Sequence, residues 1–448
     1  MRGLTVRAVL FSLTADLIPY YALYALLFAD HGLNTAQIST LLAIWSATSF
    51  LLEVPSGAWA DTVSRRALLI LSGFLLVAGF ASWTLWPTYA GFALGFVLWG
   101  TSGALRSGTF EALIYDDLAA YPSTDGRGRG ATSEYPRIMG YVRGAAESAA
   151  LIGILAAAPL YAWGGYALVG WSSVAIAAVH TLAACALPGA PKAVSAGAVE
   201  DLEDPETAET PETAATTAVS PRAGSAAVAR YLHMLRSGLR EALRVKVIRR
   251  GVLLAALLDG VTAYDEYFAL LAGHAGVSPW VAAILVGVTV AGALIGAVTA
   301  GRTAAIAPRT MSIALAVGGL LFIGGALLAG LALAYPNAVY VLTALGFTAI
   351  GAAYGINYNA NVLADARLQD AIEGPARATV TSVSGLVTEV FAVVVFAFVG
   401  LASLWLPIPA VVALLGVPLL ATAALVPAWL PPRTAESVPE VSYRTTSD

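Results

Sequence analysis

Cysteine and lysine are almost absent from this chain of 448 residues. The single cysteine, Cys185, excludes an intramolecular disulfide and a cysteine-based metal cluster. Charged residues are also scarce, at 12% of the sequence, whereas 58% of the residues are hydrophobic. A soluble chain of this length would need far more polar residues to cover its surface. The composition therefore predicts a membrane protein.

Polar residues rarely interrupt twelve apolar segments, each close to the length of about 20 residues that a helix needs to cross a bilayer. The segments lack the alternating polarity of membrane-barrel strands. We therefore predict an all-α polytopic membrane protein with twelve transmembrane helices. The predicted spans are 8–28, 37–60, 67–86, 89–113, 138–162, 166–187, 250–272, 279–300, 311–334, 337–361, 378–401 and 408–430.

Lysine and arginine are missing from one set of the turns between these spans. The turns without them are Asp30–Gly32, Trp86–Thr88, Trp163–Gly165, Gly273–Gly276, Tyr335–Asn337 and Leu406–Pro409. We call this side the non-basic end, and the side with the basic loops the basic end. Because Lys and Arg are retained in the cytoplasm during insertion, the basic end and both termini are predicted to be cytoplasmic. Abundant Arg and Ala favour a GC-rich bacterium, and hence a bacterial cytoplasmic membrane.

The spans divide into two six-helix bundles, residues 1–188 and 250–430, followed by a cytoplasmic tail, 431–448. The linker, 189–249, begins with a polar segment whose composition is typical of disorder. Its residues 225–248 have apolar residues at spacings of three and four with Arg between them, which predicts a basic amphipathic helix on the anionic leaflet. Weak similarity between the first and seventh spans indicates a parallel repeat, as in secondary transporters.

The end of the second span has Gly57, then Asp61, then the pair Arg65-Arg66. This segment resembles the loop between helices 2 and 3 of the major facilitator superfamily, with Ser64 in place of the usual glycine. In that superfamily the loop joins the two halves and is broken when the cavity opens inward, so the resemblance implies a conformational gate. Gly57 would permit close helix approach, and Asp61 would offer its carboxylate to a helix N-terminus or to Arg65.

Two further segments carry the resemblance. Ser107–Asp116 looks like the end of helix 4 in a bacterial branch of the superfamily, and Arg377–Ser382 is similar to the start of helix 11. They add Glu111, Asp116 and Arg377 to the predicted gate. Helix 5 lacks the Gly-Pro-x-x-Gly-Gly motif of drug/proton antiporters, and the loop Gly301–Arg309 lacks an acidic residue. These departures leave the drug/proton antiporter subclass without motif support, whereas the resemblance to the superfamily remains.

Ionisable side chains inside the predicted spans are rare, because each costs at least ~2.5–3.5 kcal/mol at the bilayer centre. The acidic ones are Asp16, Glu147, Asp259, Asp265, Glu266 and Glu389, and the basic ones are Arg106 and Arg143. This excess of carboxylate favours proton uptake, a cationic substrate or both. Two alternatives stay open: Glu147 only neutralises Arg143 four residues away, and Glu266 faces the outer aqueous vestibule.

Uncharged polar residues accompany these carboxylates. Asp16 is followed by Pro19 and Tyr20, and a proline in a span loosens the helix and can expose carbonyls to a ligand. Tyr264, Asn357 and Asn361 make the seventh and tenth spans polar and aromatic. We therefore add Tyr20, Tyr264, Asn357 and Asn361 to the predicted substrate and proton pathway, which suits a substrate of mixed polarity.

Together with the resemblance, these patterns predict a secondary active transporter with alternating access. Protonation of one or more of Asp16, Glu147, Asp259 and Glu389 would drive efflux of a small amphipathic or cationic molecule. Proton-coupled uptake is the alternative, and a transporter-like sensor or a membrane-embedded enzyme are the rivals from other classes. The sequence lacks HExxH, GxSxG and Walker motifs, so no enzymatic activity is expected. We expect a monomer in a lipid bilayer, with no cofactor, metal site or nucleic acid partner.

Overall fold

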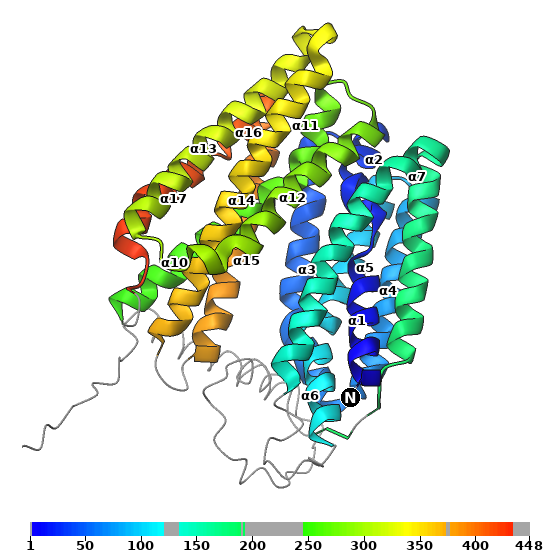
Figure 1. Ribbon diagram of the computed structural model, residues 1–448. Coiled ribbons are helices and arrows are strands. Elements are labelled where there is room, and N and C mark those ends of the chain that lie inside the picture. The colour runs from blue at the N-terminus through cyan, green and yellow to red at the C-terminus, as the bar shows by residue number, and fades with distance from the viewer. Residues whose placement is uncertain (1, 121–133, 190, 193–244, 373–376, 433–448) are drawn as a thin grey trace, which may run out of the picture.

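The computed structural model describes residues 2–120, 134–189, 191–192, 245–372 and 377–432. Within these ranges every regular element is a helix, so the all-α prediction is confirmed. The helices form an N-terminal half, residues 2–187, and a C-terminal half, residues 246–430, which lie side by side (Figure 1). The predicted amphipathic helix 225–248 lies outside the described residues except for its last few, which start the first helix of the C-terminal half.

Six predicted spans make up the N-terminal half. Its elements are α1 Arg2–Asp16, η1 Pro19–Ala22, α2 Tyr24–Asp30, α3 Thr35–Thr62, α4 Arg65–Leu85, α5 Tyr89–Arg106, α6 Thr109–Ala119 and α7 Tyr135–Cys185. Helix α7 contains two spans, because Gly164 and Gly165 leave the helical conformation in its middle. Gly165 has a φ of 60°, which glycine adopts without a steric cost.

The C-terminal half has the other six predicted spans. Its elements are α10 Lys246–Gly260, η3 Val261–Tyr267, α11 Phe268–His274, α12 Pro279–Thr303, α13 Pro308–Leu331, η4 Ala332–Ala334, η5 Pro336–Ala338, α14 Val339–Ala371, α15 Arg377–Ala402, α16 Ile408–Leu414 and α17 Val417–Trp429. The half begins at Lys246 rather than at 250. Helix α14 continues ten residues past the predicted end of its span at 361.

Nine segments of the described chain are long and apolar enough to cross a membrane. One of them, Tyr135–Cys185, contains two predicted spans. The two predicted spans outside this set, 89–113 and 250–272, are helical but interrupted. The nine segments thus contain ten of the twelve predicted spans. Membrane crossing by the other two, which are interrupted, stays a prediction.

Four spans that the sequence predicts as continuous helices are broken in the structure: the twelfth between α16 and α17, and three others beside charged residues. The first span breaks before Pro19, whose ring removes a backbone donor and clashes with the preceding turn. The fourth span breaks between Arg106 and Thr109, where Gly108 has a φ of 66°. The seventh span changes to a 3₁₀-helix after Gly260. Helix ends inside a membrane protein leave backbone groups without hydrogen-bond partners. Polar side chains beside the breaks in the first, fourth and seventh spans can supply such partners.

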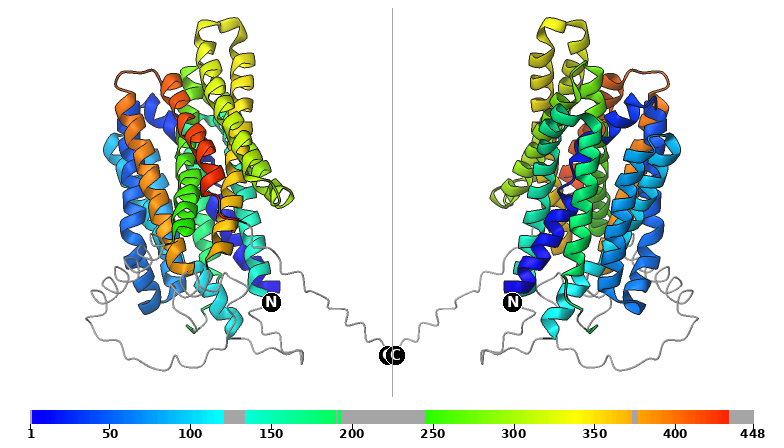
Figure 2. Two further views of the ribbon diagram at one scale, coloured as in Figure 1. Left: turned by 90° about the vertical axis from the view of Figure 1, so that its left-hand side faces the viewer. Right: turned by 90° about the vertical axis from the view of Figure 1, so that its right-hand side faces the viewer.

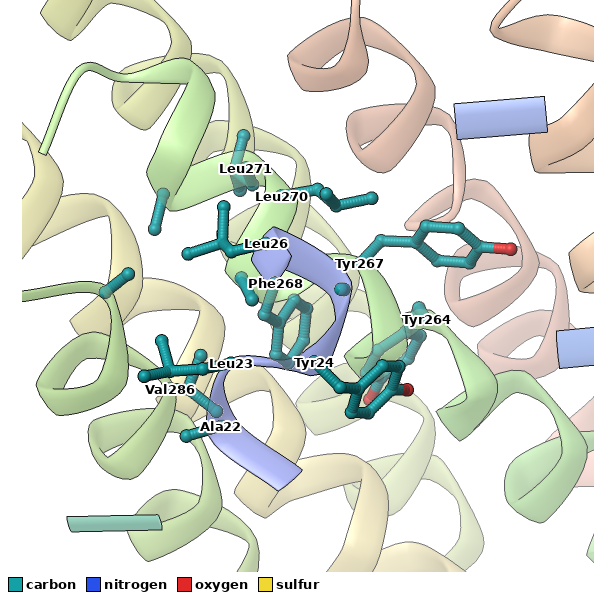
Figure 3. Packing of buried hydrophobic residues seen from close by; sticks show 14 of the residues in the cluster. Ala22, Leu23, Tyr24, Leu26, Tyr264, Tyr267, Phe268, Leu270, Leu271 and Val286 are labelled. Atoms are coloured by element: carbon teal, nitrogen blue, oxygen red, sulfur yellow. The ribbon is translucent and has the colours of Figure 1, made fainter. Parts of the chain in front are cut away.

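The two halves share one buried core near the non-basic end. This shared core joins residues of α2, such as Tyr24 and Leu26, with Tyr264 and Phe268 of the C-terminal half. Figure 3 shows these side chains packed together. Towards the basic end the cores are separate: one cluster belongs to the N-terminal half alone and two belong to the C-terminal half alone. The views in Figure 2 show the first residues of α1 beside α6, at this same end.

Candidate substrate and proton pathway

A cavity of about 300 Å³ lies in the N-terminal half, between α1, the junction of α5 with α6, and α7. Its charged lining residues are Asp16, Arg106, Glu111 and Arg143. Phe11, Phe110, Met139 and Val142 form much of its apolar lining. The cavity thus combines a few polar groups with an apolar wall, which is the usual composition of a small-molecule site.

Asp16 and Arg106 form an ion pair inside this cavity, with 3.7 Å between Arg106 Nη1 and Asp16 Oδ2. Each residue is the last of its helix, Asp16 of α1 and Arg106 of α5. The helix dipole favours Arg106 at the C-terminus of α5 and disfavours the charge of Asp16 at the C-terminus of α1. The ion pair with Arg106 offsets this unfavourable interaction of Asp16. Their side chains are 24% and 40% exposed, and solvent reaches both. The structure therefore brings together two of the predicted site residues.

A row of stacked aromatic rings, the aromatic wall, begins at Tyr21, which interacts electrostatically with this ion pair. The ring of Tyr21 stacks on Trp99 at 5.2 Å between centroids, and Trp99 stacks on Trp45 at 5.0 Å. Tyr21 lies within electrostatic range of Asp16, Arg106 and, from the C-terminal half, Glu266. The sequence analysis missed both tryptophans. Trp99 precedes Arg106 by two helical turns, and this spacing was the available signal that they share a face.

Tyr20, the predicted pathway tyrosine, is instead turned into the N-terminal half. It is only 1% exposed, and its hydroxyl lies 2.8 Å from Thr84 Oγ1. Its backbone N–H donates to Ser173 Oγ at 3.1 Å. The neighbouring Tyr21 takes the position beside the ion pair, because the 3₁₀ turn after Pro19 rotates consecutive side chains away from α-helical spacing.

In the C-terminal half, neutral donors hold the predicted carboxylates. Asn361 Nδ2 donates to Asp259 Oδ1 at 3.0 Å, and the Tyr354 hydroxyl donates to Asp265 Oδ2 at 2.8 Å. Both bonds join α14 to the broken seventh span. Tyr354 of the tenth span was not among the predicted site residues, and its hydrogen bond to Asp265 assigns it to this group.

Asn357 and Tyr264 are buried in the C-terminal half. Asn357 is 0% exposed and donates to the carbonyl of Leu258 at 3.0 Å, just before α10 changes to a 3₁₀-helix. The bond pairs a backbone oxygen at a helix break, which is a structural task. The Tyr264 ring, also 0% exposed, packs on Tyr354 and Phe322. In this conformation Asn357 and Tyr264 therefore have a structural role, as buried neighbours of the region that contains Asp259 and Asp265.

Glu147 and Glu389 occupy different environments. Glu147 is exposed on α7 and lies within electrostatic range of Asp16 and of Tyr358 on α14. Glu389 on α15 accepts a hydrogen bond from Ser46 Oγ on α3 at 2.6 Å. A second polar contact between the halves joins Ser39 Oγ of α3 to the Tyr267 hydroxyl at 2.9 Å. Glu389 therefore belongs to the seam between the halves and not to the cavity.

The predicted gate centres on a buried ion pair between Arg65 and Asp116, each with a side chain 2% exposed. Asp61, which is 42% exposed, lies farther from the Arg65 guanidinium, at 3.8 Å. Arg66 donates to the carbonyl of Cys185, at the end of α7. Ser64, which replaces the usual glycine, accepts a hydrogen bond from the N–H of Ala67 and caps α4.

Gly57 does not have the predicted role. A Cβ added to Gly57 would meet no atom within 4 Å, so this glycine does not mediate a close helix approach in this conformation. Glu111 lines the cavity beside Arg106. The side chain of Arg377 lies outside the described residues.

A second, smaller cavity of about 180 Å³ adjoins the gate and is lined by Ser64, Arg65, Arg66 and Lys192, among others. Burial and the neighbouring Arg65 charge lower the pKa of the Lys192 ammonium. The basic groups at this place thus already repel one another. The Asp116 carboxylate is therefore important for keeping Arg65 buried.

Arg367 provides a counterpart of the gate in the C-terminal half. It is 5% exposed, and its Nη2 donates to the carbonyls of Ala304 and Ile306 at 3.3 and 2.8 Å. These carbonyls belong to the connection between α12 and α13, the loop that lacks an acidic residue. The sequence analysis missed Arg367 because it lies beyond the predicted end of the tenth span. A guanidinium at the end of α12 also complements the helix dipole.

A bundle of apolar helices with a charged cavity defines a membrane transporter rather than an enzyme. The chain belongs to the Major Facilitator Superfamily, whose family model matches residues 8–369. Known structures of this superfamily have the same fold. A nucleoside transporter, NupG, is 12% identical with a TM-score of 0.62, covering 94% of this chain and 98% of its own. No curated protein sequence matches the chain.

Two further structures show the same likeness. A D-xylose-proton symporter is 14% identical, with a TM-score of 0.62 and coverage of 96% of this chain and 98% of its own. An auto-inhibited peptide transporter of the POT family is 11% identical, with a TM-score of 0.65 and coverage of 97% and 98%. At these identities the likeness concerns the fold alone.

Proposed function

We propose that the protein is a proton-coupled secondary transporter that exports a small amphipathic or cationic molecule across a bacterial cytoplasmic membrane. The observation that carries the proposal is the cavity at the Asp16–Arg106 ion pair. Its two charges are placed at helix breaks in the apolar part of a transporter fold, beside the ring of Tyr21. A solvated ion pair there costs folding free energy, which a binding role explains.

Alternating access is supported by the distribution of the buried cores. The halves are joined near the non-basic end and have separate cores near the basic end, as expected of a transporter open towards the basic side. If the basic end is cytoplasmic, this conformation receives its substrate from the cytoplasm. Closing at the basic end and opening of the shared core would then release the substrate outside.

We infer the chemistry of the substrate from the Asp16–Arg106 ion pair and from the aromatic wall that begins at Tyr21, outside the lining of the cavity. The stacked rings of Tyr21, Trp99 and Trp45 offer apolar surface, and a cation is attracted to such rings as well as to carboxylates. Glu266 of the C-terminal half lies within electrostatic range of the same tyrosine. An amphipathic organic cation would therefore meet an apolar wall from one half and a carboxylate from the other.

The test is flux through the purified protein in liposomes that contain a pH-sensitive dye. A panel of labelled organic cations, with ethidium as the first, would be offered with and without a pH gradient. We expect gradient-driven flux of a cation, with proton movement in the opposite direction. Flux of protons in the same direction as the compound would instead establish uptake by symport. Absence of any gradient-dependent flux across the panel would contradict the proposal and favour a sensor.

A further inference from the structure

Acidic side chains dominate the broken seventh span and the facing helix of the C-terminal half. Asp259 and Asp265 belong to the seventh span, and Asp365 belongs to α14. In the described part of this half, Lys and Arg lie near the basic end, and Arg367 of α14 is engaged with loop carbonyls. Asp259 and Asp265 thus have neutral hydrogen-bond donors where Asp16 has an arginine, and Asp365 interacts electrostatically with Arg143 of the N-terminal half.

One face of α14 connects the three aspartates. Tyr354, Tyr358, Asn361 and Asp365 follow at spacings of four, three and four, which places them on one side of the helix. Tyr354 donates to Asp265 and Asn361 donates to Asp259. We call Asp259, Asp265, Asp365 and these α14 residues the acidic ladder. It extends from the basic end towards the shared core.

Tyr358 is the link between the two hydrogen-bonded carboxylates. Its phenol lies within electrostatic range of both Asp259 and Asp265, and its ring packs on Tyr354 at 5.9 Å between centroids. Asp259 in turn interacts electrostatically with Asp365. The groups are therefore coupled, and the charge on one affects proton binding by the others.

Other charged groups face the acidic ladder from the elements around it. Glu266 belongs to the same 3₁₀ segment as Asp265, and Glu389 belongs to α15, which packs on α10. Across the gap between the halves, Glu147 faces Tyr358 and Arg143 interacts with Asp365. Across this gap one basic group, Arg143, thus lies opposite several carboxylates. Moving these carboxylates from water into a closed interface is unfavourable while they carry like charges.

We propose that the acidic ladder is the proton-binding site of the transporter and that its protonation permits the two halves to close at the basic end. Each aspartate takes one proton from water onto a carboxylate oxygen and becomes a neutral acid. Asn361 and Tyr354 remain in hydrogen-bonding contact with the neutral form, because an amide and a phenol both donate and accept. This assignment rests on the proposed proton coupling and places it in the C-terminal half, apart from the cavity of Asp16 and Arg106.

The test requires no substrate, because the proton itself is the probe. Cys185 is replaced by alanine, and spin labels are attached through Ala119→Cys on α6 and Val247→Cys on α10, two exposed positions at the basic end of different halves. The distance between the labels is measured in lipid nanodiscs from alkaline to mildly acidic pH. In this parent protein we expect acidification to increase the short-distance population.

The variant with Asp259→Asn and Asp265→Asn mimics the protonated ladder. We expect it to show the short distance already at alkaline pH, with little further change on acidification. Tyr358→Phe, a milder change, should move the midpoint of the pH response without abolishing it. Asp370→Asn, on α14 but outside the ladder, is the matched control and should titrate like the parent. Size-exclusion chromatography checks that each variant is folded.

Two outcomes would overturn the proposal. One is a double variant that titrates like the parent, and the other is a parent whose label distance does not respond to pH. Loss of the response in Asp16→Asn alone would also overturn it, since the proton site would then lie in the N-terminal half. The proposed function is judged separately by gradient-driven flux. A parent that transports but shows no distance change retains the function and loses the ladder.

Discussion

The two halves of the molecule provide different partners for their carboxylates. In the N-terminal half two carboxylates pair with an arginine: Asp16 with Arg106, and Asp116 with Arg65. In the C-terminal half Asp259 and Asp265 receive neutral donors. An arginine favours the charged form of a nearby carboxylate more strongly than an amide or a phenol does. The comparison indicates a half suited to binding charged groups and a half suited to binding protons.

The basic ends of the halves differ in a related way. In the N-terminal half the guanidinium comes from Arg65, the first residue of α4 at the end of the α3–α4 connection, and the carboxylate of Asp116 comes from α6. In the C-terminal half the helix supplies the guanidinium of Arg367, and the loop supplies backbone carbonyls. Donor and acceptor have exchanged places between the connection and the helix that it contacts. This explains how the loop between α12 and α13 remains attached without the acidic residue that the sequence lacks.

The largest effect on stability is expected at the buried ion pair of the N-terminal half. Arg65→Met leaves the Asp116 carboxylate buried without its main partner, which should lower the free energy of unfolding by about 3–5 kcal/mol. Arg367→Met removes hydrogen bonds to carbonyls and should cost less, about 1–3 kcal/mol. Unfolding of both variants in the same detergent, followed by circular dichroism, measures the difference. Equal losses would remove the distinction between the two basic ends.

The next effect, on transport, is expected at the cavity. Arg106→Gln removes the positive charge 3.7 Å from Asp16, a partly exposed ion pair worth about 1 kcal/mol, and should lower flux by about 5-fold. The double variant Asp16→Asn with Arg106→Gln should fold as well as the parent, because no lone charge remains. Initial rates in proteoliposomes measure the change. Parent-like flux in Arg106→Gln would show that the cavity is not the substrate site.

A smaller effect is expected in the acidic ladder. Tyr354→Phe deletes the hydrogen bond that the charged form of Asp265 receives. Asp265 then protonates more readily, so the pH response of the label distance should move to higher pH by up to about one unit, the equivalent of one hydrogen bond. The distance measurement between the spin labels on α6 and α10 detects the shift. A movement to lower pH would reverse the assigned role of Tyr354.

The smallest effect is expected at Asp61. This carboxylate is exposed and lies 3.8 Å from Arg65, so Asp61→Asn should change the free energy of unfolding by less than about 1 kcal/mol. Thermal unfolding beside Asp116→Asn, the buried equivalent, provides the comparison. If both variants lost the same stability, Asp61 would be as important for holding Arg65 as Asp116.

Periodicity and composition predicted the all-α fold, because apolar length and the scarcity of charge depend only on the bilayer. Rarity of charge inside the spans selected Asp16, Arg106 and Asp259, and the polarity of the tenth span selected Asn361. The structure brings these four residues together in two pairs. Tertiary stacking determines the aromatic wall of Trp45 and Trp99, so no local pattern predicts it. The sequence suggested that Pro19 loosens the first helix, but whether Tyr20 or Tyr21 lies near the Asp16–Arg106 ion pair depends on the 3₁₀ turn that follows.

Residues near span ends were the hardest to assign. Asp365 and Arg367 lie beyond residue 361, where the tenth span was predicted to end, and were therefore treated as loop residues. Helix α14 continues to Ala371, so Asp365 and Arg367 lie on a helix, which determines the direction of their side chains. Hydrophobicity marks where a helix leaves the bilayer and not where it stops, so polar functional groups on such extensions are missed.

The central claim is that protons bind in the C-terminal half and substrate binds in the N-terminal half. It is tested most directly by measuring two activities of the Asp259→Asn, Asp265→Asn variant in the same proteoliposomes. These are gradient-driven flux of a transported cation and exchange of that cation without a gradient. We predict that exchange persists while gradient-driven flux is lost. Gradient-driven flux at the parent rate would contradict the claim.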